Sequence, residues 1–525
     1  MSTDKSLYYG WVPEWIKLPM MILAMFPHLM LLTLFHSNTA FTASALGIEL
    51  EDIQYFLSLM YGAVVVALLT FQRLFSYFRV RTYILLSCSI SILILLGISL
   101  TRDPFVIGVL RVAEGIFCVL EGACFLPLVM MQIKHPKSRT IAYFFLYTFM
   151  LTGGTITTSL LKESIMDYGW EDMIRVVFYW HLIVIAIAVV FLNNNRLSRK
   201  FPLYQIDLAS CLFLLLSLSC GAYVLIYGRK YYWFAHGSII VNSSLFLIFG
   251  ALFVLKQSLV KRPLFHFDVL RYRNILYGIL LFALFYIIRS GLNNVYTVMA
   301  SVWKWPWHYV VDIQYINVAG TIIGVGSSGL LLLKDVSPKY IFGPGFLLLT
   351  ASCFLFVPAC YPDTTMTTVG LPLFIQGVGQ GWLFTPLVIY ISTGVSSHHV
   401  GNAGLMGTTV RFWSTNMGFA LIQNLSYTFN QKHFVQLEQT LNSSNPIIGS
   451  YWETLVLNYS GTYGDNLARL LATKKLGATV SQQASLLSNM EIFTYLGILG
   501  AAVTCTIFLL GPVKTLFMRL RLPYL

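Results

Sequence analysis

Long apolar stretches alternate with short polar segments along almost the whole chain. A run of about 20 apolar residues is long enough to cross a bilayer as a helix, in which the backbone groups pair within the segment. The pattern therefore predicts an all-α integral membrane protein with fourteen spanning helices. Their approximate limits are 17–42, 54–74, 81–101, 105–132, 140–161, 173–193, 206–227, 237–256, 275–300, 309–333, 339–360, 367–393, 401–427 and 491–513.

Lysine and arginine gather in every second connection between these segments. If the N-terminus is placed inside, the inner connections carry basic clusters, whereas the opposite short loops hold few basic residues. The positive-inside rule then predicts a multi-pass protein of the cytoplasmic membrane with both termini in the cytoplasm. The inner clusters lie at 5–17, 73–81, 134–139, 196–200, 256–273, 334–339 and 514–521.

The composition agrees with this picture. Hydrophobic residues make up 57% of the 525 residues and charged residues 10%, against roughly 25% charged residues in soluble domains. The net charge of +13 is spread between apolar runs rather than along one face, which argues against a nucleic-acid partner. The eight cysteines lack metal-site spacing, and we expect no cofactor. Glycine-rich stretches at 320–329 and 377–381 lack a Walker loop, so we expect them to permit close helix approach.

The connection at 428–490 differs from the others. It is polar and mixed in charge, and the stretches YTFNQKHFVQLEQTL and DNLARLLATKKL place apolar residues at helical spacing. We expect an extracytoplasmic amphipathic extension here. It is either a solvated appendage or a docking surface for a periplasmic partner.

The stretch RVAEGIFCVLEGACFLPLVMMQI, residues 111–133, carries three ionisable side chains within one apolar span. At 100° per residue, Arg111, Glu114 and Glu121 share one face of the helix. Ionisable residues inside a membrane are costly, so they indicate a functional site by default. Arg111 could be structural, with Glu114 as its partner one turn away, or it could tune a neighbouring proton carrier. We expect the proton site to be Glu114 or Glu121.

A short internal repeat indicates the architecture. EGACFLPLV at 121–129 aligns with QGWLFTPLV at 380–388, which lies eight predicted spans further on. The matches include Phe125 with Phe384 and Pro127 with Pro386. Two parallel six-span repeats with two extra spans between them would produce this offset, and two such halves are the design of many secondary transporters. We therefore expect six-helix bundles at 1–200 and 263–525, with two inserted helices at 201–262.

Several longer stretches extend this interpretation. Five stretches carry a resemblance: LRVAEG at 110–115, PLYQIDLASCLFLLLSLSCGAYVLIYGRKYYWF, KRPLFHFDVLRYRN, GQGWLFTPL, and HHVGNAGLMGTTVRFWSTNMGFAL with its Arg411. They resemble segments of the major facilitator superfamily. Within that superfamily the chain resembles the fourteen-span drug:proton antiporters of the EmrB/QacA type. The resemblance implies a major facilitator fold and proton-coupled multidrug efflux by alternating access.

The chain departs from this family's pattern in three places. The loop QRLFSYFRVR keeps Leu74 and Arg81 of the gating motif, but Gln72 and Ser76 replace its Gly and Asp. The fifth-span motif is reduced to Gly153 and Gly154, and His36 stands where the first span normally carries an acid. From the resemblance and the repeat, we expect structural or gating roles for Leu74, Arg81, Pro127, Gly153, Gly154, Pro386 and Arg411.

The remaining site expectations concern proton and substrate. Proton coupling is assigned to Glu114 or Glu121 with Arg111, and to His36 because of its place in the family pattern. A lone intramembrane His28 could be a satisfied hydrogen-bonding group or a proton relay. Arg289 could bind an anionic substrate group or pair with an acid across the bundle. The residues assigned to substrate binding are His28, Phe125, Arg289, Asn293 and Phe384.

The sequence thus favours a proton-coupled exporter of lipophilic or amphipathic compounds that is embedded in the lipid bilayer. The outer extension suggests a periplasmic adaptor protein and an outer-membrane channel as partners. Two alternatives remain: an exporter of one metabolite, such as a lipid, siderophore or pigment, and a non-transporting sensor on the same scaffold. An enzyme is not expected, because HYVVD at 308–312 is one residue too short for the acyltransferase pattern His-x4-Asp.

Overall fold

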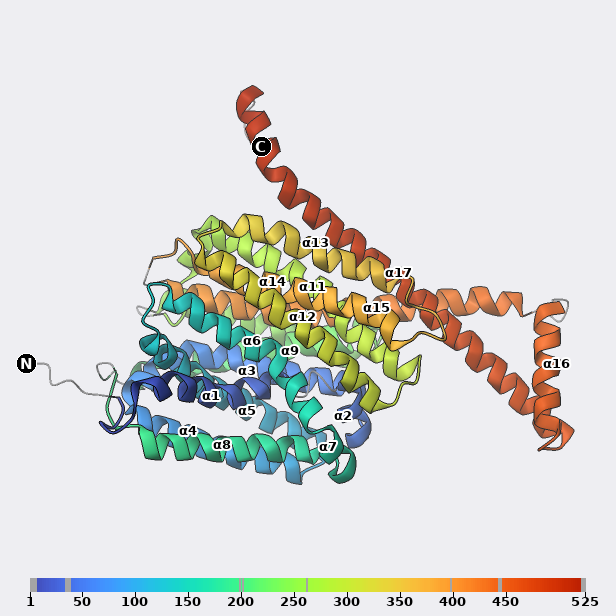
Figure 1. Ribbon diagram of the computed structural model, residues 1–525, viewed down its shortest axis with the longest axis horizontal. Coiled ribbons are helices and arrows are strands. Elements are labelled where there is room, and N and C mark those ends of the chain that lie inside the picture. The colour runs from blue at the N-terminus through green and yellow to red at the C-terminus, as the bar shows by residue number, and fades with distance from the viewer. Residues whose placement is uncertain are drawn as a thin grey trace, which may run out of the picture.

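A computed structural model describes residues 7–33, 39–197, 200, 203–260, 263–396, 399–441 and 446–520, with side chains described up to 509. The first part of the chain forms α1 (Glu14–Thr33), α2 (Thr39–Leu46), α3 (Leu50–Tyr77), α4 (Val80–Leu100), α5 (Pro104–Gln132), α6 (Ser138–Leu160), α7 (Lys162–Tyr168) and α8 (Glu171–Phe191). Most of these helices lie side by side with their axes roughly aligned (Figure 1). Polar turns separate them, as the sequence pattern predicts.

The second part contains α9 (Leu208–Tyr227), α10 (Gly237–Leu259), α11 (Arg273–Ser301), α12 (Trp307–Leu333), α13 (Pro338–Phe356), α14 (Met366–Ser392), α15 (Val400–Thr440), α16 (Pro446–Ser460) and α17 (Asp465–Leu520). Short 3-10 turns cover Leu203–Gln205, Trp233–Ala235 and Phe267–Arg271. The prediction of an all-helical membrane protein is confirmed.

The number of spans is not confirmed. Among the described residues, 12 helices are long and apolar enough to cross a membrane. Helices α13 and α15 also occupy predicted spans but fall outside this set. The apolar part of α13, Tyr340–Phe356, is short. Helix α15 has polar residues along most of its length, including Thr408, Thr409, Arg411 and Asn416.

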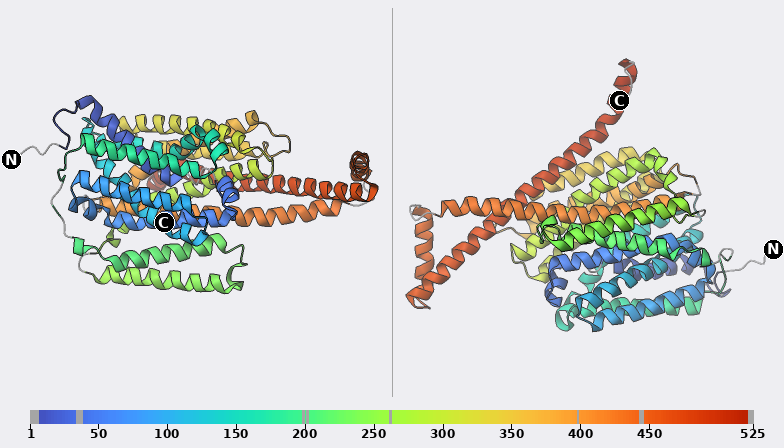
Figure 2. Two further views of the ribbon diagram at one scale, coloured as in Figure 1. Left: turned by 90° about the horizontal axis from the view of Figure 1, so that it is seen from below. Right: turned by 180° about the vertical axis from the view of Figure 1, so that it is seen from behind.

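Helices α9 and α10 form a hairpin on one side of the bundle, where α9 packs against α3 and α15 (Figure 2). Asp207 caps α9 by accepting a hydrogen bond from the Ser210 backbone N–H, and its carboxylate lies 2.7 Å from Nζ of Lys256 on α10. Although burial alone would raise the pKa of Asp207, the bonds from Lys256 and Ser210 lower it below the usual value. The ionised carboxylate thereby ties the start of α9 to the end of α10.

Glycines bring α12 and α14 into close contact, as their clustering predicts. A Cβ atom at Gly320 or Gly324 would lie 2.3 or 2.2 Å from the carbonyl oxygens of Phe374 and Val378. In the opposite direction, Cβ atoms at Gly377 and Gly381 would each lie 2.3 Å from α12 carbonyl oxygens. Only glycine permits this separation, so the expectation of close helix approach is confirmed.

The predicted helical extension at 428–490 is confirmed as helix. The C-terminal part of α15, α16 and the first half of α17 project from one end of the bundle, opposite the end at which α1 begins (Figure 1). Lys432 and Glu491 form an ion pair of 2.9 Å between α15 and α17 at its base. The side of the membrane on which it lies, and the domain boundaries at 200 and 262, stay predictions.

Candidate functional site

Helix α5 carries the ionisable stripe into the interior of the first group of helices. It begins after Asp103, which caps the helix by accepting from the backbone N–H groups of Phe105 and Val106, with Pro104 at the first position. Helix α5 then packs against α1, α3 and α4. Arg111, Glu114 and Glu121 are 2%, 2% and 1% exposed, so all three charged groups are buried in protein.

Arg111 and Glu114 form one unit. The Arg111 guanidinium pairs with the Glu114 carboxylate through Nη1, and its Nη2 lies 3.0 Å from the sulfur of Met60 on α3. Gly115 allows α3 to approach closely, because a Cβ atom there would lie 2.3 Å from the Met60 carbonyl oxygen. The ion pair therefore lies at the tight contact between α3 and α5.

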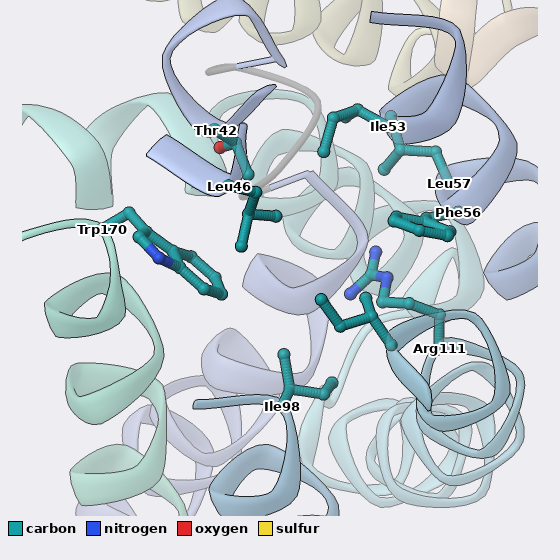
Figure 3. Close-up of a pocket in the computed structure, with 9 residues that line it drawn as sticks. Thr42, Leu46, Ile53, Phe56, Leu57, Ile98, Arg111 and Trp170 are labelled. Carbon is teal, nitrogen blue, oxygen red and sulfur yellow. The ribbon is translucent and has the colours of Figure 1, made fainter. Parts of the chain in front are cut away.

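A small cavity adjoins this pair. Figure 3 shows the Arg111 guanidinium beside Phe56, facing the space between α2, α3, α4 and α5. The cavity has a volume of about 10 Å³, which is at the lower limit for one water molecule. Its lining is otherwise mainly apolar: Thr42, Leu46, Ile53, Phe56, Leu57, Ile98, Ile107 and Trp170.

Glu121 is the centre of a second, separate group. Its Oε2 atom lies 2.7 Å from Nδ1 of His28 on α1 and 3.0 Å from Nε2 of His181 on α8. All three side chains are fully buried. Three helices that are distant in sequence thus bring one carboxylate and two imidazoles together. We call His28, Glu121 and His181 the His–Glu–His triad.

The hydrogen bonds of His181 restrict the protonation of the triad. Its Nδ1 atom lies 2.7 Å from the backbone carbonyl oxygen of Val177, which can only accept, so Nδ1 carries a hydrogen. A neutral His181 would then present an unprotonated Nε2 to the oxygen of Glu121 3.0 Å away. This contact requires a further proton, either on Nε2 or on the carboxyl group. The geometry therefore accommodates one exchangeable proton within the triad.

The surroundings of the triad are closely packed. The ring of Phe125 stacks on His28 at a centroid distance of 5.4 Å and an angle of 9°. The thiol of Cys118 donates to the backbone carbonyl of His28 at 3.1 Å. Within the described part of the chain, Oε1 of Glu121 is buried without a hydrogen-bond partner. The three potential ligand atoms lie within 4.8 Å of one another, so tests of proton exchange need a metal chelator as a control.

The structure brings together some of the residues singled out from the sequence. Glu121, His28 and Phe125 meet, whereas Arg111 and Glu114 form their own pair about two to three turns earlier on α5. His36 lies outside the described residues. His181 was not predicted from the sequence, although a single histidine in the apolar run EDMIRVVFYWHLIVIAIAVVF is itself an intramembrane ionisable residue and a signal of function.

A second buried polar network lies around α14. Nε of Arg289 on α11 donates to Oε1 of Gln380 at 2.8 Å. Nε2 of Gln380 donates in turn to Thr321 at 2.6 Å and to Asn317 at 3.0 Å on α12. In the internal repeat, Gln380 is the counterpart of Glu121. Glu121 and Gln380, at equivalent positions of the repeat, thus each contact several polar side chains.

Arg411 and Phe384 lie close to this network. Nη2 of Arg411 donates to the Tyr61 hydroxyl at 2.8 Å, and its Cζ atom lies 5.8 Å from the ring centroid of Phe384. The Phe384 ring contacts Tyr147, Phe282, Phe285 and Tyr286 at centroid distances of 5.0 to 6.2 Å. Asn293 lies one turn after Arg289 on α11.

The residues expected to act in gating occupy helix contacts and helix ends. Nη1 of Arg81 donates to the Tyr9 hydroxyl at 2.8 Å, and Leu74 accepts the N–H of Phe78 at the end of α3. Gly153 faces Met30 and Phe26 of α1, and Gly154 is buried on the same helix. Pro127 and Pro386 lie inside α5 and α14. Their gating roles stay predictions.

Comparison with known proteins identifies the family to which this architecture belongs. A model of the Major Facilitator Superfamily matches residues 20–418, which is most of the chain. The chain belongs to the major facilitator superfamily. The resemblance seen in the sequence motifs is thereby confirmed, and membrane transport by this superfamily member is supported.

The curated relatives are multidrug transporters of the same superfamily. The probable multidrug resistance protein EmrY of Escherichia coli (strain K12) is 23% identical over 428 residues, which cover 79% of each chain. The multidrug export protein EmrB of Haemophilus influenzae is 21% identical over 407 residues, covering 74% of this chain and 76% of that protein. The chain is thus a major facilitator protein similar to multidrug exporters at low identity.

Solved structures agree on the fold alone. A structure from a study of proton-dependent oligopeptide transporters superposes with a TM-score of 0.59 at 12% identity, covering 95% of this chain and 99% of that chain. The nucleoside transporter NupG superposes with a TM-score of 0.54 at 12% identity, covering 94% and 100%. The major facilitator fold therefore extends through most of the chain, including the triad.

Proposed function

We propose that this chain is a proton-coupled exporter of lipophilic or amphipathic compounds, with the His–Glu–His triad as its proton-carrying centre. The observation that carries the proposal is the buried contact of Glu121 with His28 and His181. The carbonyl of Val177 fixes the His181 tautomer, so the contact needs one additional proton. The similarity to multidrug exporters supports the transport class.

The charge of the triad explains why proton exchange would be coupled to a conformational change. With the additional proton, the triad is neutral overall, either as a carboxylate with an imidazolium or as a carboxylic acid with neutral rings. Loss of that proton would leave one net negative charge among fully buried side chains, which is strongly unfavourable. The proton therefore leaves or enters only in a state that admits water to Glu121.

Alternating access then provides antiport. A state open to the cytoplasm would release the proton and take up the substrate, and a state open to the outside would release the substrate and regain a proton. The two states must differ in their affinity for the proton, because a ligand shifts an equilibrium only through differential binding. In this scheme Arg111 and Glu114 hold α5 against α3, and the triad performs the exchange.

The localisation and assembly partners follow from the same scheme. We place the protein in the cytoplasmic membrane with both termini inside, and the extension formed by α15, α16 and α17 outside. In a cell with two membranes, this extension would dock a periplasmic adaptor protein that leads to an outer-membrane channel. Exposed apolar side chains on the extension, such as Leu457 and Leu470, support a docking role.

The proposal is tested in everted membrane vesicles with an acid interior. Lipophilic cations, dyes and fatty acids are added in turn, and loss of the pH gradient is followed by a fluorescent probe. We expect the wild-type chain to dissipate the gradient on addition of a substrate, and Glu121→Gln to abolish this response. Glu114→Gln removes the carboxylate of the structural ion pair but keeps the triad, so the fraction of this variant that folds should retain the response.

Vesicles without the chain correct for compounds that carry protons by themselves, and a chelator excludes an effect of bound metal. If no compound produces a response while the protein is present and folded, multidrug antiport is contradicted. A response that Glu121→Gln leaves intact would contradict the role of the triad.

A further inference from the structure

Two arginines in the interior of the molecule have no acidic partner among the described residues. Arg289 lies near the middle of α11, and Arg411 lies within the predicted membrane-spanning part of α15. The ion pairs of the described residues involve neither of them, whereas Arg111 has Glu114. A guanidinium is permanently charged, and an uncompensated charge inside a membrane protein is costly. Such a charge indicates a function.

In the described helices that pack against α11 and α15, the carboxylates lie near helix ends or are already paired, as Glu491 of α17 is with Lys432. Helices α6, α11, α13 and α14 contain no Asp or Glu. On α3, Glu51 and Asp52 lie in the first turn, where they contact Gln423 and Tyr227. On α12, Asp312 pairs with Lys162 near the helix end. The interior between the two halves therefore has a positive charge.

The two guanidinium groups approach the same aromatic ring. Cζ of Arg289 lies 5.7 Å and Cζ of Arg411 lies 5.9 Å from the ring centroid of Tyr286. Arg411 also lies 5.0 Å from the ring centroid of Tyr61 on α3 and contacts the sulfur of Met150 on α6. Aromatic rings from both halves thus surround the positive charges.

These side chains retain accessible surface although protein encloses them. Arg411 contacts residues on α3, α6, α11 and α14, so it does not face lipid. Arg289, Arg411, Tyr61 and Tyr147 are nevertheless only half-buried. The accessible surface that Arg411 retains therefore faces other helices of the bundle rather than lipid.

We infer that Arg289 and Arg411 form the anion-binding part of the substrate site, and that the transported compound is an amphipathic organic anion. A carboxylate, phosphate or sulfonate headgroup would bind between the guanidiniums, which match planar and tetrahedral oxyanions. The apolar body would lie against Phe384, Tyr286 and Tyr147. This inference rests on the proposed export function, whose substrate class it names.

The repeat supports this division of roles. At equivalent positions, Glu121 contacts two histidines in the first half and Gln380 contacts Arg289 in the second half. Likewise, Phe125 stacks on His28, whereas Phe384 lies beside Arg411. The first half thus presents proton-binding groups, and the second half presents anion-binding groups.

A matched pair of fluorescent ligands tests the charge preference directly. 1-Pyrenebutyrate and (1-pyrenebutyl)trimethylammonium have the same apolar body and opposite charge. Their binding is measured on the full chain in nanodiscs of zwitterionic lipid, with empty nanodiscs as the blank. We expect the wild-type chain to prefer the anion by roughly tenfold or more, since like charges buried together are strongly unfavourable.

Variants assign the preference to the two arginines. Arg411→Gln and Arg289→Gln should each weaken binding of 1-pyrenebutyrate by roughly tenfold to a hundredfold, the effect of removing one partner of a buried charge pair. Arg411→Lys keeps the charge and should weaken it less, which guards against a folding defect in the glutamine variant. Arg175→Gln, at an exposed arginine on α8, is the control and should bind as the wild-type chain does.

Equal affinity of the wild-type chain for both ligands, or equal loss of both in the arginine variants, would overturn the inference. Binding of the anion is independent of proton exchange, so the two proposals fail separately. Selective anion binding without any pH-gradient response would retain this site and contradict proton-coupled export. A pH-gradient response to cations, in a chain that does not bind the anion selectively, would support proton-coupled export and contradict the anion-binding site.

Discussion

The buried charges of α5 differ in the partners that they contact. Glu114 and Glu121 belong to the same helix face, yet they have different surroundings. Glu114 pairs with a permanent cation, Arg111, whereas Glu121 contacts two groups that can lose their charge. A carboxylate beside imidazoles can exchange a proton without leaving a permanent cation unpaired. This difference favours Glu121 as the proton carrier.

His181 is predicted to be essential for coupling. In His181→Gln the side chain can still hydrogen-bond but cannot carry a proton, so we expect substrate accumulation driven by a pH gradient to fall by roughly tenfold or more, in the range of general acid–base effects. Accumulation is measured in proteoliposomes. The exposed His266 provides the control His266→Gln, which should transport normally. Normal gradient-driven accumulation by His181→Gln would contradict the assignment.

The pair of Arg111 and Glu114 is predicted to be structural. Arg111→Met would leave Glu114 buried without its cation, which we expect to cost about 3–5 kcal/mol of stability. The double variant Arg111→Met with Glu114→Met removes both charges and should recover much of this loss. Thermal unfolding of the purified chain compares the three proteins. Equal destabilisation by the single and the double variants would mean that the ion pair is not the cause.

Periodicity predicted the shared face of Arg111, Glu114 and Glu121, because side-chain direction follows from 100° per residue. It could not predict which helices that face would meet. The separation between Glu121 and His181 is 60 residues and depends on how α1, α5 and α8 pack. Three-dimensional packing was therefore needed to separate the stripe into an ion pair and a proton-binding triad.

For the individual helices, the sequence predicted where each helix lies in the chain better than it predicted which helices are long and apolar enough to cross a membrane. The long, predominantly apolar runs became α3, α4, α5 and α8 with ends within a few residues of expectation. Helix α15 differs because its polar residues lie against other helices, as Asn416 does against Ser58 at 2.5 Å. Polar groups that other helices satisfy lower the apolar signal of a span without excluding it from the bundle.

The contact between α12 and α14 is predicted to depend on individual glycines. In Gly324→Ala the new Cβ atom would lie 2.2 Å from the Val378 carbonyl oxygen, so the helices must separate. We expect a loss of about 1–3 kcal/mol, as for other overpacked contacts. Gly326→Ala, two residues away, is a matched control because nothing lies within 4 Å of its Cβ position. Thermal unfolding that affects both variants equally would argue against close packing as the cause.

In the molecule as a whole, ion pairs join α6 and α12 at both ends of their contact. Lys162, which follows α6, lies 2.6 Å from Asp312 near the start of α12. At the opposite end, Lys137, which precedes α6, lies 2.6 Å from Asp335 after α12. The proposed alternating access requires α6 and α12 to separate at one end at a time, so these pairs are suited to oppose opening at each end.

Breaking one pair is predicted to loosen one end only. Asp312→Asn should raise hydrogen exchange around residues 160–165, and Asp335→Asn should raise it around 133–139. The pairs are partly exposed, so each shift should correspond to about 0.2–1 kcal/mol. Asp268→Asn, which removes a pair with Arg271 within one turn, serves as the control. Equal changes at both ends in either variant would contradict separate opening.

Whether Glu121 carries the exchanged proton is decided by comparing two transport modes in proteoliposomes. Counterflow exchanges labelled for unlabelled substrate and needs no net proton movement, whereas accumulation against a gradient is driven by the pH difference. We expect Glu121→Gln to retain counterflow and to lose accumulation. Accumulation at the wild-type level in Glu121→Gln would show that Glu121 does not carry the exchanged proton.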